Sequence, residues 1–561
     1  MIDTHQRREL FWFFAIAFVV LAAGIGLRDP WPADEPRFVL VAKQMWESGD
    51  WLFPHRGSEL YADKPPLYFW MLCAAYALVR NWTWAFLLPS LVAAMATLFL
   101  TYDLARRLWS HRAGLWAAIG VLACGGFLYQ AKRAQIDPTV VAFITLGTYG
   151  IARHLLRGPD WRWYWIGCFA AGLGVISKGV GFLALLMLLP YAWMRWRKWP
   201  GLAPLGDDSR WRWWGGALAF FAAIALWFVP MLVTASTSGD PERHAYVQEL
   251  LFRQTATRYT SAWHHTQPPW YFLEIIAGMW LPFSLAIPWL IPRWRDALRA
   301  RDAAVWLPLA WALLVLVFFS ASPGKRDMYI LPMLPMLAVA AGPFLPDIVA
   351  SKRFRACLFA LVLVLAIALA GAGIAALAGD PAFEARIESE RGLPPGSDAL
   401  WWLLISCGAS MVGTCAVWRS NGLKAAGIAL SLLVVLLFSG TAVLLDGENS
   451  SRVVMARARA AAGDATLGLV GWKEQNLLQA VGPVEDFGFK QPVDVQLRAG
   501  ISWMAEAPAT RRLFVLDGAI DACVLRDHAM PVGTANRRGW WLLDMSAIAP
   551  ACLPGAANSG R

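Results

Sequence analysis

The run FWFFAIAFVVLAAGIGL, residues 11–27, decides what kind of fold this chain adopts. It carries no charged side chain, and Arg7 and Arg8 precede it. About 20 consecutive apolar residues are enough for a helix to cross the hydrocarbon core of a bilayer. No small-residue cleavage site follows the run, so we expect a retained membrane anchor rather than a cleaved signal peptide. The preceding arginines predict a cytoplasmic N-terminus.

Similar apolar runs recur to about residue 446. The chain has 561 residues, 58% of them hydrophobic, and a mean hydropathy of +0.45. A soluble protein of this size needs more polar surface. Many of the 33 tryptophans stand at the ends of apolar runs, where aromatic belts form. The sequence therefore predicts a polytopic α-helical membrane protein.

The net charge of +11 does not indicate a nucleic-acid partner. The basic residues cluster in short loops between apolar runs, as the positive-inside rule predicts for cytoplasmic loops. They do not form one stripe with interleaved aromatic side chains. We expect contact with bilayer lipids and no binding of nucleic acid.

Loop charges predict about thirteen spanning helices. The expected spans are 10–27, 84–104, 113–130, 138–156, 163–177, 180–194, 213–234, 271–291, 303–320, 328–347, 356–378, 400–417 and 425–445. The apolar stretch 65–80 is short and opens with Pro65 and Pro66, so we expect an interfacial or re-entrant helix there. This topology places the C-terminus in the periplasm.

Two domains follow from this topology. Residues 1–446 form the membrane domain, with a first periplasmic loop at 28–83 and a second large one at 235–270. Residues 447–561 lack a spanning run and predict a small periplasmic α/β domain. Its expected strands are Thr466–Gly471, Arg512–Leu516 and Trp540–Asp544, and its expected helix is Glu474–Val481. Cys523 and Cys552 lie in this domain and could form a disulfide if it is exported.

The first periplasmic loop is rich in charged side chains. It reads Trp31-Pro-Ala-Asp34-Glu35-Pro-Arg37-Phe38 at its start and Asp63-Lys64-Pro65-Pro66 near its end. Carboxylates beside hydrocarbon are costly, which favours a functional role for Asp34 and Glu35. The same outer face should carry Lys132, Arg133, Asp137, Lys178, Arg253, Arg258, His264, His265, Lys325 and Arg326. Cations there oppose the positive-inside trend, and binding of an anion at the membrane surface would account for them.

Several of these residues have a structural alternative. Arg37 and Glu47 could form the wet face of a surface helix over 36–48, and His55 could be only a loop residue. Asp137, directly before Pro138, could simply cap a helix. His264 and His265 are adjacent, and adjacent residues rarely chelate one ion.

The ordered motifs resemble a known family. They are Trp31-x-x-Asp34-Glu35-x-Arg37-Phe38, Ser48-Gly49-Asp50-Trp51, Pro54-His55, Lys64-Pro65, Ile136-Asp137-Pro138, Ser177-Lys178-Gly179, Arg258-Tyr259 and Gly324-Lys325 with Tyr329. The set is similar to that of bacterial aminoarabinose transferases, which belong to the protein-mannosyltransferase-like GT-C class of glycosyltransferases. The resemblance covers roughly residues 8–345, and the later spans match only in layout.

The resemblance implies a GT-C-type fold and a polyprenyl-phosphate sugar as the donor. Asp34 would be the catalytic carboxylate with Glu35 beside it, and Asp137 would be its partner near the acceptor. The donor phosphate would be held by Lys64, Arg258, Lys325 and Tyr329. Arg37, His55 and Lys178 would contact the acceptor or the donor. A divalent metal in such a site would use Asp63 and His265, although family members often carry Glu at the position of Asp63.

The chemistry agrees with these roles. Breaking the bond between the anomeric carbon and phosphate builds negative charge, which preorganised cations stabilise. A single displacement would invert the anomeric centre. The expected activity is transfer of aminoarabinose, or a related sugar, to a lipid A phosphate on the periplasmic side of the bacterial inner membrane, carried out by a monomer.

Two other functions fit part of the pattern. Protein O-mannosyltransferase-like glycosylation of exported proteins uses the same class of donor. A polyprenyl-lipid flippase or transporter is the second alternative, but transporters place ionisable residues near the bilayer midplane within broken helices. Here the charged residues collect at span ends on one face, which favours a transferase.

Overall fold

The computed structural model describes residues 3–205, 210–250, 266–379, 385–386, 388 and 398–553. Each expected spanning segment is helical in this part of the chain. By length and composition, seven helices among the described residues could cross a membrane, or up to nine if each of two bent pairs is one span. The shorter apolar helices Leu67–Val79, Gly181–Trp196 and Asp327–Ala341 are additional. The count of about thirteen crossings therefore stays a prediction.

The centre of the bundle includes α5 (Leu88–Leu108), α8 (Ile136–Arg157) and α9 (Trp161–Lys178), and α1 (Thr4–Ala22) lies against α5 at the edge. Helices α8 and α9 approach closely through glycine. A Cβ on Gly150 would lie 2.2 Å from the Trp163 carbonyl oxygen. Small residues allow such approach between membrane helices, where apolar side chains gain nothing by leaving lipid.

Two expected spans are bent, which hydropathy did not predict. The segment 113–130 forms α6 (His111–Ala123) and α7 (Gly125–Ala131), which meet at 69°. The segment 271–291 forms α14 (Tyr271–Met279), η4 (Phe283–Ala286) and α15 (Ile287–Arg299), with a bend of 100°. The breaks meet, because the Gly125 N–H donates to the Leu281 carbonyl at 3.0 Å. Backbone groups freed at one break are thus satisfied at the other.

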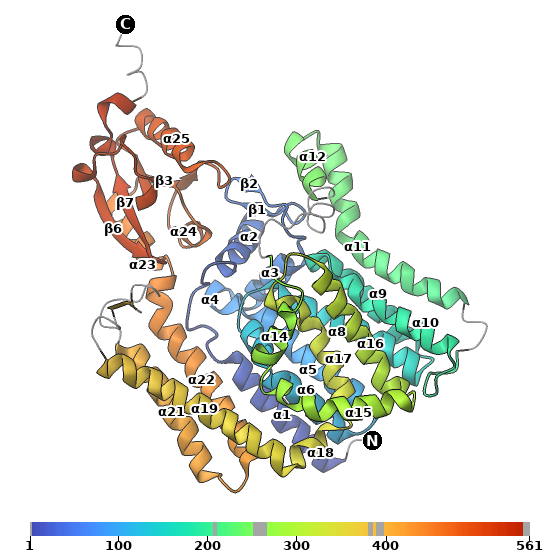
Figure 1. Cartoon of the computed structure of the whole chain (residues 1–561). Helices are drawn as coiled ribbons and strands as arrows, with labels where there is room; N and C mark the ends of the chain where they lie inside the picture. Colours follow the sequence, from blue (N-terminus) through green and yellow to red (C-terminus); the bar gives the residue numbers. More distant parts are fainter. Residues whose placement is uncertain are drawn as a thin grey trace.

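The remaining helices surround this centre. They are η1 (Gly181–Met187), α10 (Leu188–Trp196), α11 (Arg210–Ser238), α12 (Pro241–Gln248), α16 (Ala303–Ala321), η5 (Asp327–Met333), α17 (Leu334–Ala341), α18 (Leu345–Ala350), α19 (Lys352–Ala378), α21 (Asp398–Val417) and α22 (Gly422–Asn449). Helices α19, α21 and α22 pack together at one side of the bundle (Figure 1).

The loop after the first expected span, called the first loop below, folds into compact elements of its own. These are α2 (Glu35–Ser48), β1 (His55–Arg56), β2 (Glu59–Leu60), α3 (Leu67–Val79) and α4 (Trp82–Ala85). The expected surface helix over 36–48 is α2, and the expected short helix over 65–80 is α3. The first part of α2 is buried on all sides, since Phe38 to Ala42 are consecutive buried residues, and the helix is exposed only near its end, at Glu47.

The C-terminal domain begins with α23 (Arg452–Ala462). Its sheet has the order β4-β3-β5-β7-β6, with β3 parallel to β4 and β5 and the last two strands antiparallel. The strands are β3 (Thr466–Val470), β4 (Val484–Asp486), β5 (Arg511–Leu516), β6 (Met530–Ala535) and β7 (Arg538–Leu543), joined by α24 (Glu474–Leu478) and α25 (Val493–Glu506). All three expected strands and the expected helix are confirmed. Cys523 and Cys552 form a disulfide.

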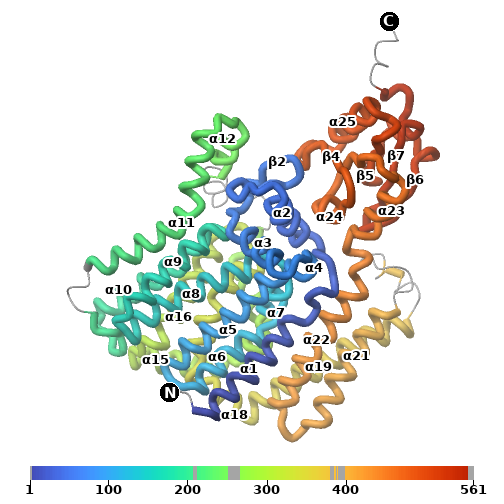
Figure 2. The backbone as a smooth tube through the Cα atoms, turned by 180° about the vertical axis from the view of Figure 1, so that it is seen from behind, coloured from blue at the N-terminus to red at the C-terminus, as the bar shows by residue number. Residues whose placement is uncertain are grey.

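The two ends of the bundle differ. The C-terminal domain and the β1–β2 hairpin lie at the same end, and the N-terminus lies at the other (Figures 1 and 2). The basic loop after α5 lies at the N-terminal end, because the His111 Nε2 atom is 3.1 Å from a Glu9 carboxylate oxygen. The charged first loop and this basic loop are therefore on opposite faces, as the topology requires.

Candidate active site

Asp34 stands at the start of α2, where the first span gives way to the loop helix. Its carboxylate forms a salt bridge with Arg37 one turn along the helix and lies 3.7 Å from the Arg326 guanidinium. Its second oxygen accepts a hydrogen bond from the Gln135 side-chain amide at 3.2 Å. The side chain is 15% exposed, so it is shielded but still reachable. Two cations and one amide therefore hold an accessible carboxylate.

Asp137 lies close by, at the beginning of α8. It forms a salt bridge with Lys178, the last residue of α9. The Lys178 ammonium also lies 5.3 Å from the centroid of the Tyr329 ring. Gln135, the residue before α8, donates to Asp34, and Asp137 lies two residues further along in the first turn of α8. The start of α8 therefore lies beside Asp34. The structure thus brings Asp34, Asp137, Lys178 and Tyr329 into one region.

Glu35 points the other way and is 1% exposed. Arg28 donates to both of its carboxylate oxygens, at 2.5 and 2.8 Å. The backbone N–H groups of Trp31 and Ala134 donate to the same oxygens at 2.8 and 3.0 Å. A buried carboxylate with these contacts is fully satisfied, so Glu35 fixes the loop rather than facing the site.

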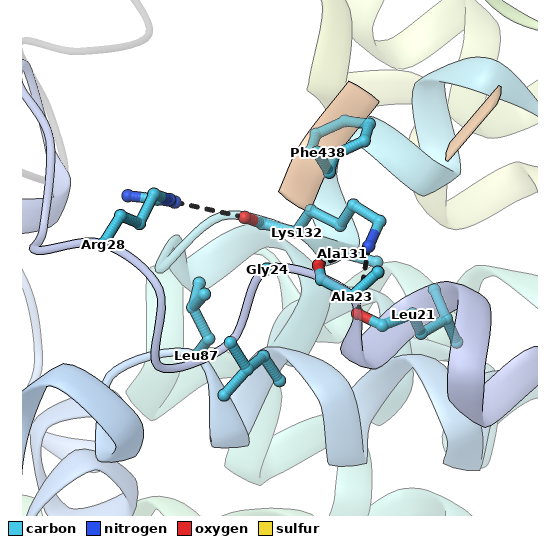
Figure 3. Close-up of a pocket in the computed structure, with 9 residues that line it drawn as sticks. Leu21, Ala23, Gly24, Arg28, Leu87, Ala131, Lys132 and Phe438 are labelled. Carbon is cyan, nitrogen blue, oxygen red and sulfur yellow. Dashed lines mark hydrogen bonds between the residues drawn. The ribbon is translucent and has the colours of Figure 1, made fainter. Parts of the chain in front are cut away.

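Lys132 extends this arrangement to the end of the first span. Its ammonium donates to the Ala23 carbonyl at 2.9 Å and to the Leu21 carbonyl at 3.3 Å (Figure 3). Arg28 in turn donates to the Lys132 carbonyl at 3.3 Å. These cations terminate a helix and close a loop, which explains their presence on the outer face without a ligand.

Arg37 connects the site with the rest of the loop. Burial opposes its charge, but Tyr61, Asp34, Glu474 and Asp63 together raise the pKa of the Arg37 guanidinium. It therefore remains charged at every pH of interest. Glu474 belongs to the C-terminal domain, so that domain reaches the neighbourhood of Asp34.

Lys325 is buried between two loops. Its ammonium donates to the carbonyls of Ser322 and Gln267, at 2.7 and 3.0 Å. A lysine has three N–H donors, and the described residues accept two of them. Lys325 thus joins the end of α16 to the segment before α14.

The remaining candidate residues lie elsewhere in the first loop or outside the described residues. Asp63 and Lys64 are partly buried at the end of the first loop. His55 lies in the β1–β2 hairpin, which faces the C-terminal domain rather than Asp137. Arg258 and His265 lie outside the described residues, as do Arg253 and His264.

Of the two expected metal ligands, Asp63 is among the described residues and His265 is not. Within the described ranges, no three His, Cys, Asp or Glu side chains gather to hold an ion. Asp63 offers one oxygen ligand, and the second expected ligand, His265, is not described.

Sequence reasoning missed Gln135 and Arg28 and gave Arg326 no role at Asp34. Gln135 directly precedes the Ile136-Asp137-Pro138 motif, which was the available signal. Arg28 follows the first span and could be taken for an ordinary flanking cation. Only the fold shows that its partner is Glu35.

Comparisons with known proteins support the resemblance stated for the motifs. Residues 63–227 match the family model described as dolichyl-phosphate-mannose-protein mannosyltransferase. The undecaprenyl phosphate-alpha-4-amino-4-deoxy-L-arabinose arabinosyl transferase of Pseudomonas aeruginosa strain LESB58 is 31% identical over 59% of this chain and 57% of that protein. A protein of the same name from Pseudomonas fluorescens strain Pf-5 is 29% identical over 64% of this chain and 63% of that protein. The match thus spans less than two thirds of these relatives.

The fold is similar over a longer range. The crystal structure of ArnT from Cupriavidus metallidurans bound to undecaprenyl phosphate matches this chain with a TM-score of 0.73 and 20% sequence identity. The match covers 96% of this chain and 99% of the ArnT chain. The apo structure of ArnT from the same organism gives the same TM-score over 98% of this chain. These comparisons confirm the GT-C-type fold and the resemblance to aminoarabinose transferases.

Proposed function

We propose that this chain is a membrane glycosyltransferase. It transfers aminoarabinose, or a related sugar, from a polyprenyl-phosphate donor to a phosphate of lipid A. The observation that carries this proposal is the pair of carboxylates, Asp34 and Asp137, joined by Gln135 among cations. The relatives with similar sequences are named for an arabinosyl transfer involving undecaprenyl phosphate.

The reaction forms one bond and breaks one. An acceptor oxygen attacks the anomeric carbon, and the bond from that carbon to the donor phosphate breaks with inversion. The electron pair leaves with the polyprenyl phosphate, where Lys64, Arg258 and Lys325 stabilise the charge. Tyr329 would contact the donor phosphate beside these cations, and its ring lies 5.3 Å from the Lys178 ammonium that binds Asp137. Cations fixed before the reaction stabilise such charge without reorganisation.

The role of Asp34 depends on the acceptor. A lipid A phosphate is already ionised, so Asp34 then positions it and offsets positive charge on the sugar ring. A hydroxyl acceptor would instead give its proton to Asp34. Arg37 and Arg326 orient this carboxylate in either case.

The reaction takes place at the periplasmic face of the bacterial inner membrane. The disulfide between Cys523 and Cys552 supports an oxidising compartment for the C-terminal domain. With the N-terminus at the opposite end of the bundle, it then lies in the cytoplasm.

The direct test uses the purified protein in lipid nanodiscs with polyprenyl-phosphate aminoarabinose and lipid A. We expect Asp34→Asn to lower the transfer rate about 10²-fold or more, as losing a positioned acid–base group does. Glu47→Gln is the matched control, because Glu47 lies on the same helix but is exposed. Full activity of Asp34→Asn would contradict the catalytic role.

The same assay separates the acceptors when an exported protein is added beside lipid A. A mass shift on lipid A supports the proposal, while a shift only on the exported protein would favour O-glycosylation.

We propose Asp63 and His265 as ligands of a divalent metal. Treatment with a chelator should then lower the rate, and re-addition of the metal should restore it.

A further inference from the structure

The C-terminal sheet binds the first loop at the edge where such sheets usually bind ligands. Strand β3 is followed by β4 on one side and β5 on the other, and its carboxyl end lies between them. At such a point, the loops that follow neighbouring strands diverge. Here the β1–β2 hairpin lies against this edge, since Ser58 donates to Asp486, the last residue of β4, through its N–H and its hydroxyl at 3.0 and 2.9 Å.

Lys473 lies in the loop after β3, beside this hairpin. Its ammonium is 5.7 Å from the centroid of the Phe489 ring, and the Arg56 guanidinium is 3.9 Å from the same centroid. Arg56 also forms a salt bridge of 3.7 Å with Glu474, the residue after Lys473. The Glu474 carboxylate is therefore paired with Arg56. Among the described residues, no carboxylate forms a salt bridge with Lys473.

The surroundings of Lys473 disfavour its charge. Partial burial, Arg538 and Arg56 all lower the pKa of the Lys473 ammonium, and Glu474 compensates only in part. Two like charges beside a partly buried ammonium cost free energy, which an anion bound between them would recover. The cations Lys473 and Arg56 around the Phe489 ring therefore suit an anionic ligand at this edge of the sheet.

This edge of the sheet is close to both the proposed active site and the membrane surface. Helix α24, which begins at Glu474, contacts α2, the helix that follows Asp34, because the Lys43 ammonium donates to the Leu478 carbonyl at 3.4 Å. Arg538 begins β7 directly after the β6–β7 turn. Because Trp540 of β7 pairs with Leu516 at the end of β5, and β5 is parallel to β3, Arg538 lies at the same edge as the loop after β3. In that turn the Asn536 N–H donates to the Glu448 carbonyl at the end of α22, at 2.7 Å. The turn is therefore at the end of a spanning helix, where lipid head groups lie.

We propose that Lys473 and Arg538, with Arg56 behind them, form an anion subsite of the C-terminal domain that binds a phosphate group of the lipid acceptor. The subsite rests on the proposed function, because it assumes a phosphorylated acceptor near Asp34. It assigns the C-terminal domain a part in substrate binding and not only in holding the first loop.

The test measures binding without turnover. The full chain in detergent is titrated with diphosphorylated lipid A micelles, with no sugar donor, and the dissociation constant is followed by microscale thermophoresis. We expect Lys473→Gln and Arg538→Gln each to weaken binding about tenfold, as loss of one charge-assisted contact does. Lys473→Arg should keep the affinity near that of the unmodified protein.

Lys490→Gln is the matched control, because this lysine of the same domain has an acidic partner, Glu249, at 3.9 Å. It should bind lipid A normally. Equal affinity of Lys473→Gln and Lys490→Gln would overturn the subsite. Arg538 is exposed, so Arg538→Gln tests the same site without risk to folding.

Further arms of the experiment separate the sources of phosphate and the two proposals. Binding that persists in excess inorganic phosphate and is lost with dephosphorylated lipid A supports a lipid-borne phosphate. Displacement by inorganic phosphate alone would overturn that assignment. If the protein fails to transfer sugar but Lys473→Gln still weakens binding, the proposed reaction fails and the subsite stands.

Discussion

Two adjacent carboxylates, Asp34 and Glu35, have opposite surroundings. Asp34 is shielded but reachable and is held by side chains from three segments. Glu35 is buried and bound by Arg28 and two backbone N–H groups. Because successive helical residues point about 100° apart, only one of the pair can face the site. The other is then available to fix the loop that carries it.

We expect Glu35→Gln to act mainly by lowering the thermal stability of the protein. Breaking a buried salt bridge leaves Arg28 charged and unpaired, which costs about 3–5 kcal/mol. Thermal unfolding in detergent should show a clear drop in melting temperature. Glu47→Gln, on the exposed side of the same helix, should leave the melting temperature unchanged. An unchanged melting temperature in Glu35→Gln would contradict the structural role.

Gln135 is a positioning residue in the proposed reaction, because it acts through Asp34. The variant Gln135→Leu lacks the side-chain amide and therefore loses the 3.2 Å hydrogen bond to the Asp34 carboxylate. We expect kcat to fall about tenfold, the loss of about 1.4 kcal/mol, with KM for the donor unchanged. A rise in KM with normal kcat would show that Gln135 binds substrate instead.

Helices in this chain are held together by close backbone approach and by paired breaks. Gly150 lets α8 pack against the Trp163 carbonyl, and Gly125 lies at the break where α7 meets the α14–α15 bend. Both contacts join segments that hydropathy treats as independent spans. The bundle is therefore specified by a few small residues as well as by its apolar runs.

Glycine substitutions test this packing. In Gly150→Ala the added methyl would lie 2.2 Å from the Trp163 oxygen, so the helices must separate, at a cost of about 1–3 kcal/mol. Gly371→Ala is the control, because nothing lies within 4 Å of a Cβ at that position of α19. It should be neutral or stabilise by up to about 1 kcal/mol. Equal melting temperatures for the two variants would refute the close approach.

The whole molecule is a helical bundle with a C-terminal domain bound to the loop that carries Asp34. One contact joins the β1–β2 hairpin to the sheet through Ser58 and Asp486. A second joins the start of the loop to α23, where Arg452 binds the buried carboxylate of Asp29 at 2.8 Å. Two contacts far apart in the sequence thus hold the C-terminal domain against this loop.

The disulfide contributes to this domain's stability. Cys523 and Cys552 are 29 residues apart, so the cross-link restricts the unfolded chain by about 2–4 kcal/mol. The double variant Cys523→Ser with Cys552→Ser should release the C-terminal domain to limited proteolysis at lower temperature. The membrane bundle should resist the protease as before. A protein of unchanged protease sensitivity would contradict this contribution.

Local pattern alone determined that the apolar segments are helical, that a helix covers 36–48, and where three strands of the C-terminal sheet lie. These features depend on the hydropathy and spacing of neighbouring residues, which the chain carries directly. The tertiary structure alone decided that Glu35 turns to Arg28, that Gln135 joins Asp34 to the start of α8, and that two expected spans break where they meet. It also added β4 and β6 to the sheet and placed Lys473 near the loop that carries Asp34. Each of these depends on contacts between residues far apart in the chain, and only the packing of the folded molecule selects such partners.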